Sequence, residues 1–230
     1  MLNIYQNIQL KMYSINTKPS PPTDPDIIWI ASIDVGKRNF AITITEYNIK
    51  TLHSLREPFS DNKYTDVTDG VSNNCRIVMM DLTDFIGSAN KLVTQDIYLN
   101  IINYLDRIKE WLDVCLTVVI EAQVKMNPEA MKIEMVIYTW LVMRYELTKD
   151  IVQFPSRLKY FETDIPKTIK TKYNRKKWAC TKTNEILTRN KDEAALTYIF
   201  KTHKPKKDDL SDTILQSIAF VKRVFVKQIL

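Results

Sequence analysis

The chain has 230 residues, of which 45% are apolar, so it is long and hydrophobic enough to fold as one domain with a buried core. It holds 3 glycines and neither a GxGxxG nor a GxxxxGKS/T sequence, which excludes the phosphate loops of Rossmann and P-loop enzymes. The 33 lysines and arginines outnumber the 27 acidic residues, and the net charge of +6 is compatible with a polyanionic partner.

The cysteines and the apolar runs indicate a soluble, intracellular protein. Cys75, Cys115 and Cys180 are odd in number, far apart and without a CxxC pair, as is typical of reduced thiols. The most apolar run, 135–143, is too short and too closely flanked by charges to span a bilayer, so we expect no membrane association. If its source is a virus, the protein would work at a cytoplasmic replication site, and otherwise in a nucleus or an organelle.

Residues 1–26 are predicted to form a flexible arm, because four prolines fall between positions 19 and 25. The apolar run 27–33 then predicts a buried strand, and 40–45 predicts a second strand that pairs with it in antiparallel fashion after a short turn. A third strand is expected in 51–58 or in 76–82, with the polar stretch 60–74 as a loop.

The second half alternates helices and strands. A helix with one buried face is expected over 92–111, followed by β-branched strand 116–120. A helix over 128–148 is apolar nearly all round, which indicates either burial in the core or a subunit interface. Strand 151–155 and a last helix over 208–230 complete the domain, 27–230, as an α/β fold with a mixed five-stranded sheet flanked by helices.

Four carboxylates stand where these elements meet. Asp34 and Glu121 end buried strands, while Asp209 and Asp212 open the last helix three residues apart, on one face. Charges beside apolar strands are costly unless they are neutralised, and two Mg²⁺ ions about 4 Å apart do this while activating water for phosphodiester hydrolysis. Taken singly, each residue also has a structural interpretation: a turn cap, a lysine partner, or a favourable charge at a helix N-terminus.

Three segments resemble the acidic motifs of RuvC-like Holliday junction resolvases, most closely those of poxviruses, other large DNA viruses and mitochondria. They are 33–41 (IDVGKRNFA), 119–123 (VIEAQ) and 207–212 (KDDLSD), and the resemblance covers 27–230. It implies an RNase H-like fold, a homodimer, and symmetric cleavage of a four-way DNA junction with two Mg²⁺ ions, for which Mn²⁺ can substitute.

By the same resemblance, Asp34, Glu121, Asp209 and Asp212 are the catalytic metal ligands. Asp208 also offers a carboxylate, but Asp209 has the spacing to Asp212 of the family's DxxD motif. Gln123 either hydrogen-bonds near the metals or closes a strand.

A basic segment precedes the last helix, with nine lysines and arginines between positions 157 and 182. Such charges bind the DNA backbone without reading sequence. The aromatic residues within it either stack on exposed bases or pack in the core. The predicted DNA-binding residues are Lys37, Arg38, Lys170, Lys172, Arg175, Lys176, Lys177 and Lys207.

Two other functions share these features. A different RNase H-like nuclease, acting on RNA–DNA hybrids or other branched DNA, would use the same carboxylates. A non-catalytic basic DNA-binding module would carry them as structural residues. A phosphotransferase of the actin-like fold would need further glycine-rich loops, which 3 glycines do not supply.

Overall fold

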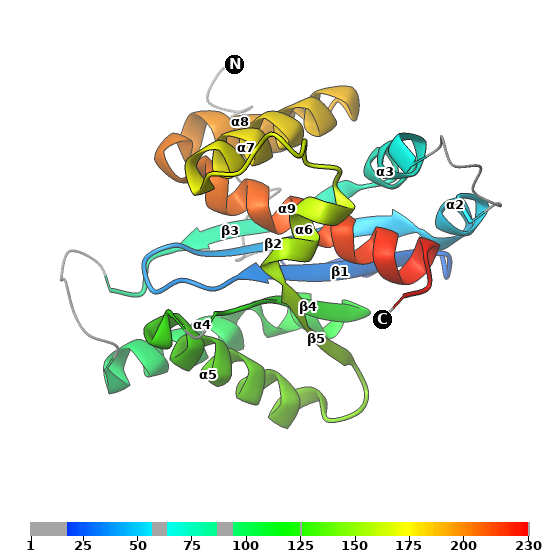
Figure 1. Ribbon diagram of the computed structural model, residues 1–230. Coiled ribbons are helices and arrows are strands. Elements are labelled where there is room, and N and C mark those ends of the chain that lie inside the picture. Colours follow the sequence, from blue (N-terminus) through cyan, green and yellow to red (C-terminus); the bar gives the residue numbers. More distant parts are fainter. Residues whose placement is uncertain (1–17, 57–63, 87–93, 125, 230) are drawn as a thin grey trace, which may run out of the picture.

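A five-stranded mixed sheet lies between two layers of helices in the computed structural model, which describes residues 18–56, 64–86, 94–124 and 126–229 (Figure 1). The strand order is β3-β2-β1-β4-β5. The strands are β1 (Ile27–Asp34), β2 (Phe40–Asn48), β3 (Arg76–Thr83), β4 (Thr117–Ala122) and β5 (Asp150–Pro155). This confirms the predicted fold class.

The helices α4 (Gln95–Asp113) and α5 (Pro128–Tyr145) cover one face of the sheet, and α9 (Lys207–Val221) crosses the other (Figure 1). The remaining elements are α2 (Ile49–Ser54), α3 (Tyr64–Asn73), α6 (Ser156–Glu162), α7 (Lys172–Arg189), α8 (Glu193–Thr197) and the short turns η1 (Tyr198–Thr202), η2 (Lys204–Lys206) and η3 (Lys222–Val226). None of the helices within the described ranges is both long and apolar enough to cross a lipid bilayer.

Strand pairing brings the predicted carboxylates to one end of the sheet. β1 is antiparallel to β2 but parallel to β4, with Ile33 opposite Ile120. Asp34 and Glu121 come directly after these two residues. They therefore lie on neighbouring strands at the same end of the sheet, because parallel strands end on the same side.

Helix α9 is buried on all sides, and its polar residues fix it against the sheet. Thr213 and Ser217 share hydrogen bonds of 2.6 and 2.5 Å with hydroxyls of β2. Gln216 donates to the carbonyl oxygens of Ile33 (3.2 Å) and Val119 (3.3 Å), just before Asp34 and Glu121. The start of α9 is thereby held over the ends of β1 and β4.

Some predicted elements were wrong. The expected loop 60–74 contains α3, whose Val67 and Val71, four residues apart, are buried in the core under α9. Of the two candidates for the third strand, 76–82 is correct, whereas 51–54 belongs to α2. The last α-helix ends at Val221 and is followed by the π-helical η3 only to Val226, instead of continuing to 230. Positions 1–17 of the predicted arm, 57–63, 92–93 and 230 lie outside the described residues.

Candidate active site

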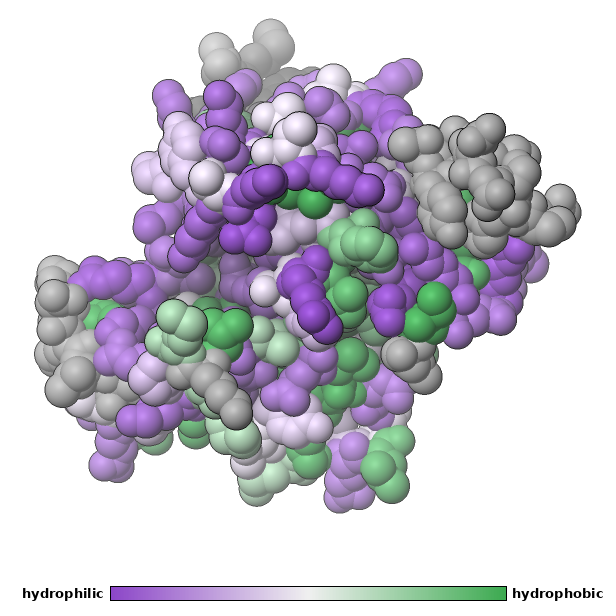
Figure 2. Space-filling view, viewed as in Figure 1, coloured by the Kyte–Doolittle hydropathy of each residue, from purple (hydrophilic) through white to green (hydrophobic). Residues whose placement is uncertain are grey.

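The four predicted carboxylates line one cleft of about 450 Å³ at the end of β1 and β4. Asp34 and Glu121 come from the strands, Asp209 and Asp212 from the first turns of α9. Hydrophilic side chains dominate the surface over the upper layer that contains α7, while hydrophilic and hydrophobic ones are mixed over the lower layer that contains α5 (Figure 2).

Lys159 of α6 lies at the centre of the carboxylates. Its side chain is 1% exposed, and its Nζ is 3.2 Å from Glu121 Oε1 and 3.1 Å from Asp212 Oδ2. The Tyr160 hydroxyl donates to the other oxygen of Asp212 at 3.3 Å. The ammonium partly neutralises the negative charge of the cluster.

The sequence did not single out Lys159, which was counted only as one of the nine basic residues of its segment. Its position follows from topology: β5 is parallel to β4, with Phe154 opposite Glu121, and α6 begins directly after β5. A residue in the first turn of α6 therefore lies near the end of β4.

The carboxylates have unequal proton affinities. Burial, together with the charge of Glu121 and a hydrogen bond to it, raises the pKa of Asp34 well above its ordinary value. Burial also acts to raise the pKa of Glu121, but the Lys159 charge and hydrogen bonds from Asp34 and Lys159 outweigh it, so this pKa is lowered. Of these two neighbouring carboxyl groups, Asp34 therefore has the raised pKa and Glu121 the lowered one.

The two carboxylates of α9 are also perturbed by burial, which raises the pKa of both Asp209 and Asp212. For Asp209 the next cause is the charge of Asp208, and for Asp212 the Lys159 charge opposes the shift. Ionising either carboxyl group in this cleft therefore costs free energy, because the charge is partly removed from water.

Asp209 and its neighbour Asp208 differ in environment. Asp209 is 7% exposed and lines the cleft, and its Oδ2 has no hydrogen-bond partner among the described residues. Asp208 is half-buried, does not line the cleft, and pairs with Lys176, whose Nζ is also 3.4 Å from Asp209 Oδ1. Asp209 thus lies in the cleft and Asp208 outside it.

The donor set suits a hard divalent cation. It consists of carboxylate oxygens, and the buried Oδ2 of Asp209 lacks a partner, which are the features that Mg²⁺ or Mn²⁺ would use. Within the described ranges no three acidic, histidine or cysteine side chains already converge as a ready-made metal site. The Lys159 ammonium, placed between Glu121 and Asp212, explains why their oxygens do not converge on one point.

Gln123 follows the strand-closing alternative. Its side-chain amide donates to the backbone oxygen of Glu121 at 3.2 Å, and its backbone N–H donates to Glu134. Its side chain nevertheless lines the cleft beside Glu121.

The predicted DNA-binding residues take different places. Lys172, Arg175 and Lys176 line the cleft from α7, and Lys170 and Lys177 are exposed beside them. Arg38 is exposed in the β1–β2 turn, and Lys207, partly buried, opens α9. Lys37 forms an ion pair of 2.5 Å with Glu129, so part of its charge is already neutralised.

Of the aromatic residues of the basic segment, two pack in the core and two are exposed, as stacking on bases would require. Tyr160 and Trp178 pack edge to face, with ring centroids 6.2 Å apart, and are partly buried against the core. Phe161 and Tyr173 are 68% and 75% exposed. Only the second pair is free to meet a base.

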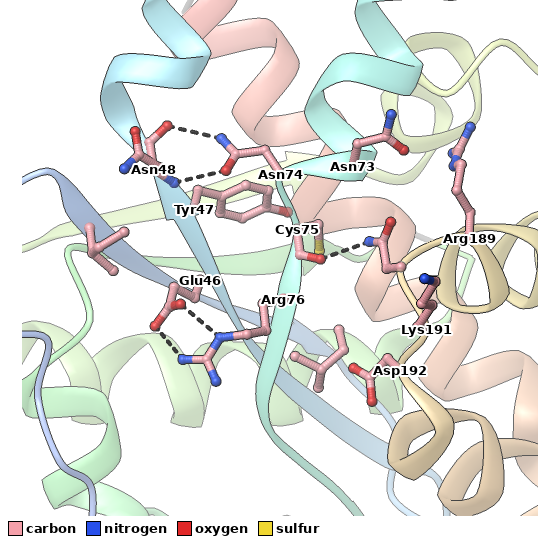
Figure 3. Close-up of a pocket in the computed structure, with 13 residues that line it drawn as sticks. Glu46, Tyr47, Asn48, Asn73, Asn74, Cys75, Arg76, Arg189, Lys191 and Asp192 are labelled. Carbon is pink, nitrogen blue, oxygen red and sulfur yellow. Dashed lines mark hydrogen bonds and ion pairs between the residues drawn. The ribbon is translucent and has the colours of Figure 1, made fainter.

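A larger cavity, of about 710 Å³, lies at the opposite end of the sheet (Figure 3). Several of its polar side chains are paired with neighbouring groups. Arg76 binds Glu46 through two hydrogen bonds of 2.7 Å, and the Asn74 side chain pairs with both the N–H (3.2 Å) and the carbonyl (2.9 Å) of Asn48. The Asn190 amide donates to the carbonyls of Ser72 and Cys75. This pairing indicates that these residues hold neighbouring elements of the fold together.

A mixed sheet in the order found here, with acidic residues at the ends of its first and fourth strands and on the last helix, defines the RNase H-like class. The solved structure of the fowlpox virus resolvase in complex with Holliday junction DNA shares this fold, at a TM-score of 0.53 and 16% identity. The likeness covers 85% of this chain and 97% of that one. The chain thus has the RNase H-like fold that the sequence predicted.

In sequence, the chain is similar to uncharacterized protein 170L of Invertebrate iridescent virus 6. The two are 28% identical over 219 residues, which cover 84% of this chain and 88% of the viral protein. No protein-family model matches the sequence.

Proposed function

We propose that the chain is a structure-selective endodeoxyribonuclease that resolves four-way DNA junctions by metal-dependent phosphodiester hydrolysis. The observation that carries this proposal is the cleft in which Asp34, Glu121, Asp209 and Asp212 meet beneath a basic helix. The shared fold with a resolvase solved on a Holliday junction supports the choice of substrate.

The four carboxylates would hold the divalent ions, Mg²⁺ with Mn²⁺ as a substitute. When bound, two such ions supply an activated water and stabilise the leaving 3′-oxygen. Lys159 remains beside Glu121 and Asp212 as a buried positive charge, placed to offset the charge that develops on a phosphate in the cleft. The hydroxyl of Tyr160 holds Asp212 in orientation through its hydrogen bond.

The basic residues of α7 would carry the DNA strand to the cleft. Lys172, Arg175 and Lys176 lie on its wall, and Lys170 and Lys177 extend the positive surface outward. Lys37, Arg38 and Lys207 are proposed as further contacts at its rim. Because such contacts release counterions, junction affinity should fall steeply with salt.

A homodimer would provide the two active sites that symmetric cleavage needs. The outer face of α5 supports this: Met135 and Met143 are 59% and 78% exposed, whereas Ile133, Ile137 and Leu141 of the inner face are buried. A groove of about 380 Å³ beside Trp140 is lined almost wholly by apolar side chains. We propose this face as the subunit contact, and a mass of one chain at all concentrations would exclude it.

The relative in an iridescent virus supports a viral source and a place of action where viral DNA is replicated.

The test is cleavage of a labelled synthetic four-way junction by the wild type and by Glu121→Gln, with MgCl₂ or with EDTA. Paired symmetric nicks that need metal and disappear in the variant are expected. A junction that is bound but never cut would indicate a binding module with structural carboxylates. Equal cleavage of an RNA–DNA hybrid would indicate a different RNase H-like nuclease.

A further inference from the structure

Glu134 is a buried carboxylate on the inner face of α5. Its side chain lies next to the apolar Ile133 and Ile137, and the residue is 6% exposed. Its Oε2 accepts the backbone N–H of Gln123 at 3.0 Å, and its Oε1 accepts the side-chain amide of Gln153 at 2.9 Å. A buried carboxylate held by two neutral donors costs stability compared with an apolar side chain. Its presence in the core therefore calls for a reason other than stability.

The two donors lie on either side of Glu121. The β4–β5 ladder ends with Ala122 opposite Pro155, so the N–H of Gln123 lies one residue beyond the last paired position. Gln153 stands opposite Ile120, the residue before Glu121. Glu134 thus links α5 to β4 and β5 on either side of Glu121. It also accepts the backbone N–H of Gln123, which lies beyond the last paired position of the β4–β5 ladder.

We propose that Glu134 is a positioning residue for the Glu121 carboxylate. By holding the backbone at Gln123, it fixes the direction in which the Glu121 side chain leaves β4, toward Lys159 at 3.2 Å. Glu134 does not line the cleft and acts only through the strand end. The inference rests on the proposed function, because the position of Glu121 matters only if it serves the cleavage reaction. The outer face of the same helix is the proposed subunit contact, so this carboxylate also links that contact to the active site.

The test uses Glu134→Gln, which replaces one acceptor oxygen by an NH₂ group that faces a donor. The cleavage rate at saturating junction should fall about ten- to hundredfold, as for other partners that orient metal ligands. Junction affinity in EDTA should stay unchanged, because no DNA contact is altered. The rise in melting temperature on adding MgCl₂ should shrink, since a misplaced Glu121 binds the ion less tightly.

The reversed pair provides the rescue. In Glu134→Gln/Gln153→Glu, the new glutamine accepts from the N–H of Gln123 and donates to the new carboxylate, so both hydrogen bonds return. We expect Gln153→Glu alone to lose activity as well, and the double variant to recover most of the rate and of the response to MgCl₂. Ile137→Val is the matched control: it weakens the packing of the same helix but leaves both hydrogen bonds of Glu134 in place, and it should keep the wild-type rate at temperatures where it is folded.

The outcomes separate this inference from the proposed function. If the wild type does not cut the junction, the proposed function fails, and the positioning role falls with it. If the wild type cuts and Glu134→Gln cuts as fast, only the inference fails. A double variant as slow as the single ones, or an Ile137→Val variant as slow as Glu134→Gln, would mean that Glu134 contributes to stability alone.

Discussion

The two ends of the central sheet use similar residues in opposite ways. At the end lined by Asn74 and Arg76, several polar groups meet complementary partners: an amide meets a peptide group, and a guanidinium meets the carboxylate of Glu46 (Figure 3). At the other end, Asp34, Glu121 and Asp212 crowd around the ammonium of Lys159. One oxygen of Asp209 there has no partner in the described part of the chain.

This difference distinguishes a structural end of the sheet from a functional one. Complementary pairs lower the free energy of the folded state, so their presence needs no further explanation. Carboxylates crowded together in a partly buried cleft raise it, and clusters of carboxylates perturbed in this way mark candidate functional sites. The larger cavity is therefore not the better candidate for a reaction site.

The largest effect is expected from Asp34→Asn. Cleavage should fall at least about 10³-fold, because one ligand of the metal pair is lost. In EDTA the melting temperature should rise, since the variant removes a carboxylate whose pKa is raised by burial and by Glu121, and whose charged form therefore destabilises the fold. Single-turnover cleavage and thermal melts measure the two effects.

The opposite signs of these two effects matter. A variant that loses activity because it unfolds would show a lower melting temperature together with a lower rate. Asp34→Asn that melts below the wild type would therefore contradict the view that this end stores unfavourable charge.

Asn74→Ala tests the other end. It leaves the N–H and carbonyl of Asn48 without their partner, which should lower the free energy of unfolding by about 1–3 kcal/mol. The cleavage rate of the folded protein should not change. Asn73→Ala, at an exposed neighbouring position, is the control and should have little effect on chemical denaturation. If the Asn74→Ala variant cleaved the junction more slowly than the wild type, this cavity would have a function in cleavage.

Much of the carboxylate end could be predicted from the sequence, for a physical reason. Asp34 and Glu121 each follow an apolar run, and a charge at the end of a buried strand is visible without knowledge of the fold. Gly36 is visible too: a Cβ there would lie 2.7 Å from the carbonyl oxygen of Asn39, so the short turn after Asp34 requires glycine.

The rest depended on tertiary contacts. Lys159 reaches the cleft only because β5 pairs with β4 in one register, which no local pattern specifies. Glu134 was hidden in a helix that appeared apolar all round. Helix α3 is rich in threonine, aspartate and asparagine, which favour turns, and forms because Val67 and Val71 are buried against the core.

The pH dependence of stability should distinguish the ends further. In EDTA, a group whose folded pKa is raised binds more protons in the folded than in the unfolded state between its two pKa values. Asp34 therefore stabilises the fold at low pH, and this contribution is lost as the pH rises from 3.8, its ordinary pKa, through the raised value. The melting temperature of Asp34→Asn minus that of the wild type should thus grow with pH.

Saturating MgCl₂ should reverse this trend, because the ion binds the deprotonated carboxylates and protects the wild type more as the pH rises. Melts of both proteins across the same pH series, with and without metal, provide the measurement. Parallel curves in EDTA would show that Asp34 is not perturbed by its neighbours.

The smallest effect is expected for the ion pair between Arg76 and Glu46. The arginine side chain is 64% exposed, so solvent screens the interaction, and a double-mutant cycle with Arg76→Gln and Glu46→Gln should give a coupling free energy of about 0.5 kcal/mol. The Glu46→Gln variant keeps an acceptor for Trp29, whose indole N–H donates to this side chain at 2.9 Å, so the core above the pair stays intact. Raising the salt concentration should reduce the coupling further. Buried, hydrogen-bonded charges can give a coupling above about 2 kcal/mol. Such a coupling, or slower junction cleavage by the Arg76→Gln variant, would mean that the charges at this end also serve the function. Charge complementarity would then no longer separate the structural end of the sheet from the reactive one.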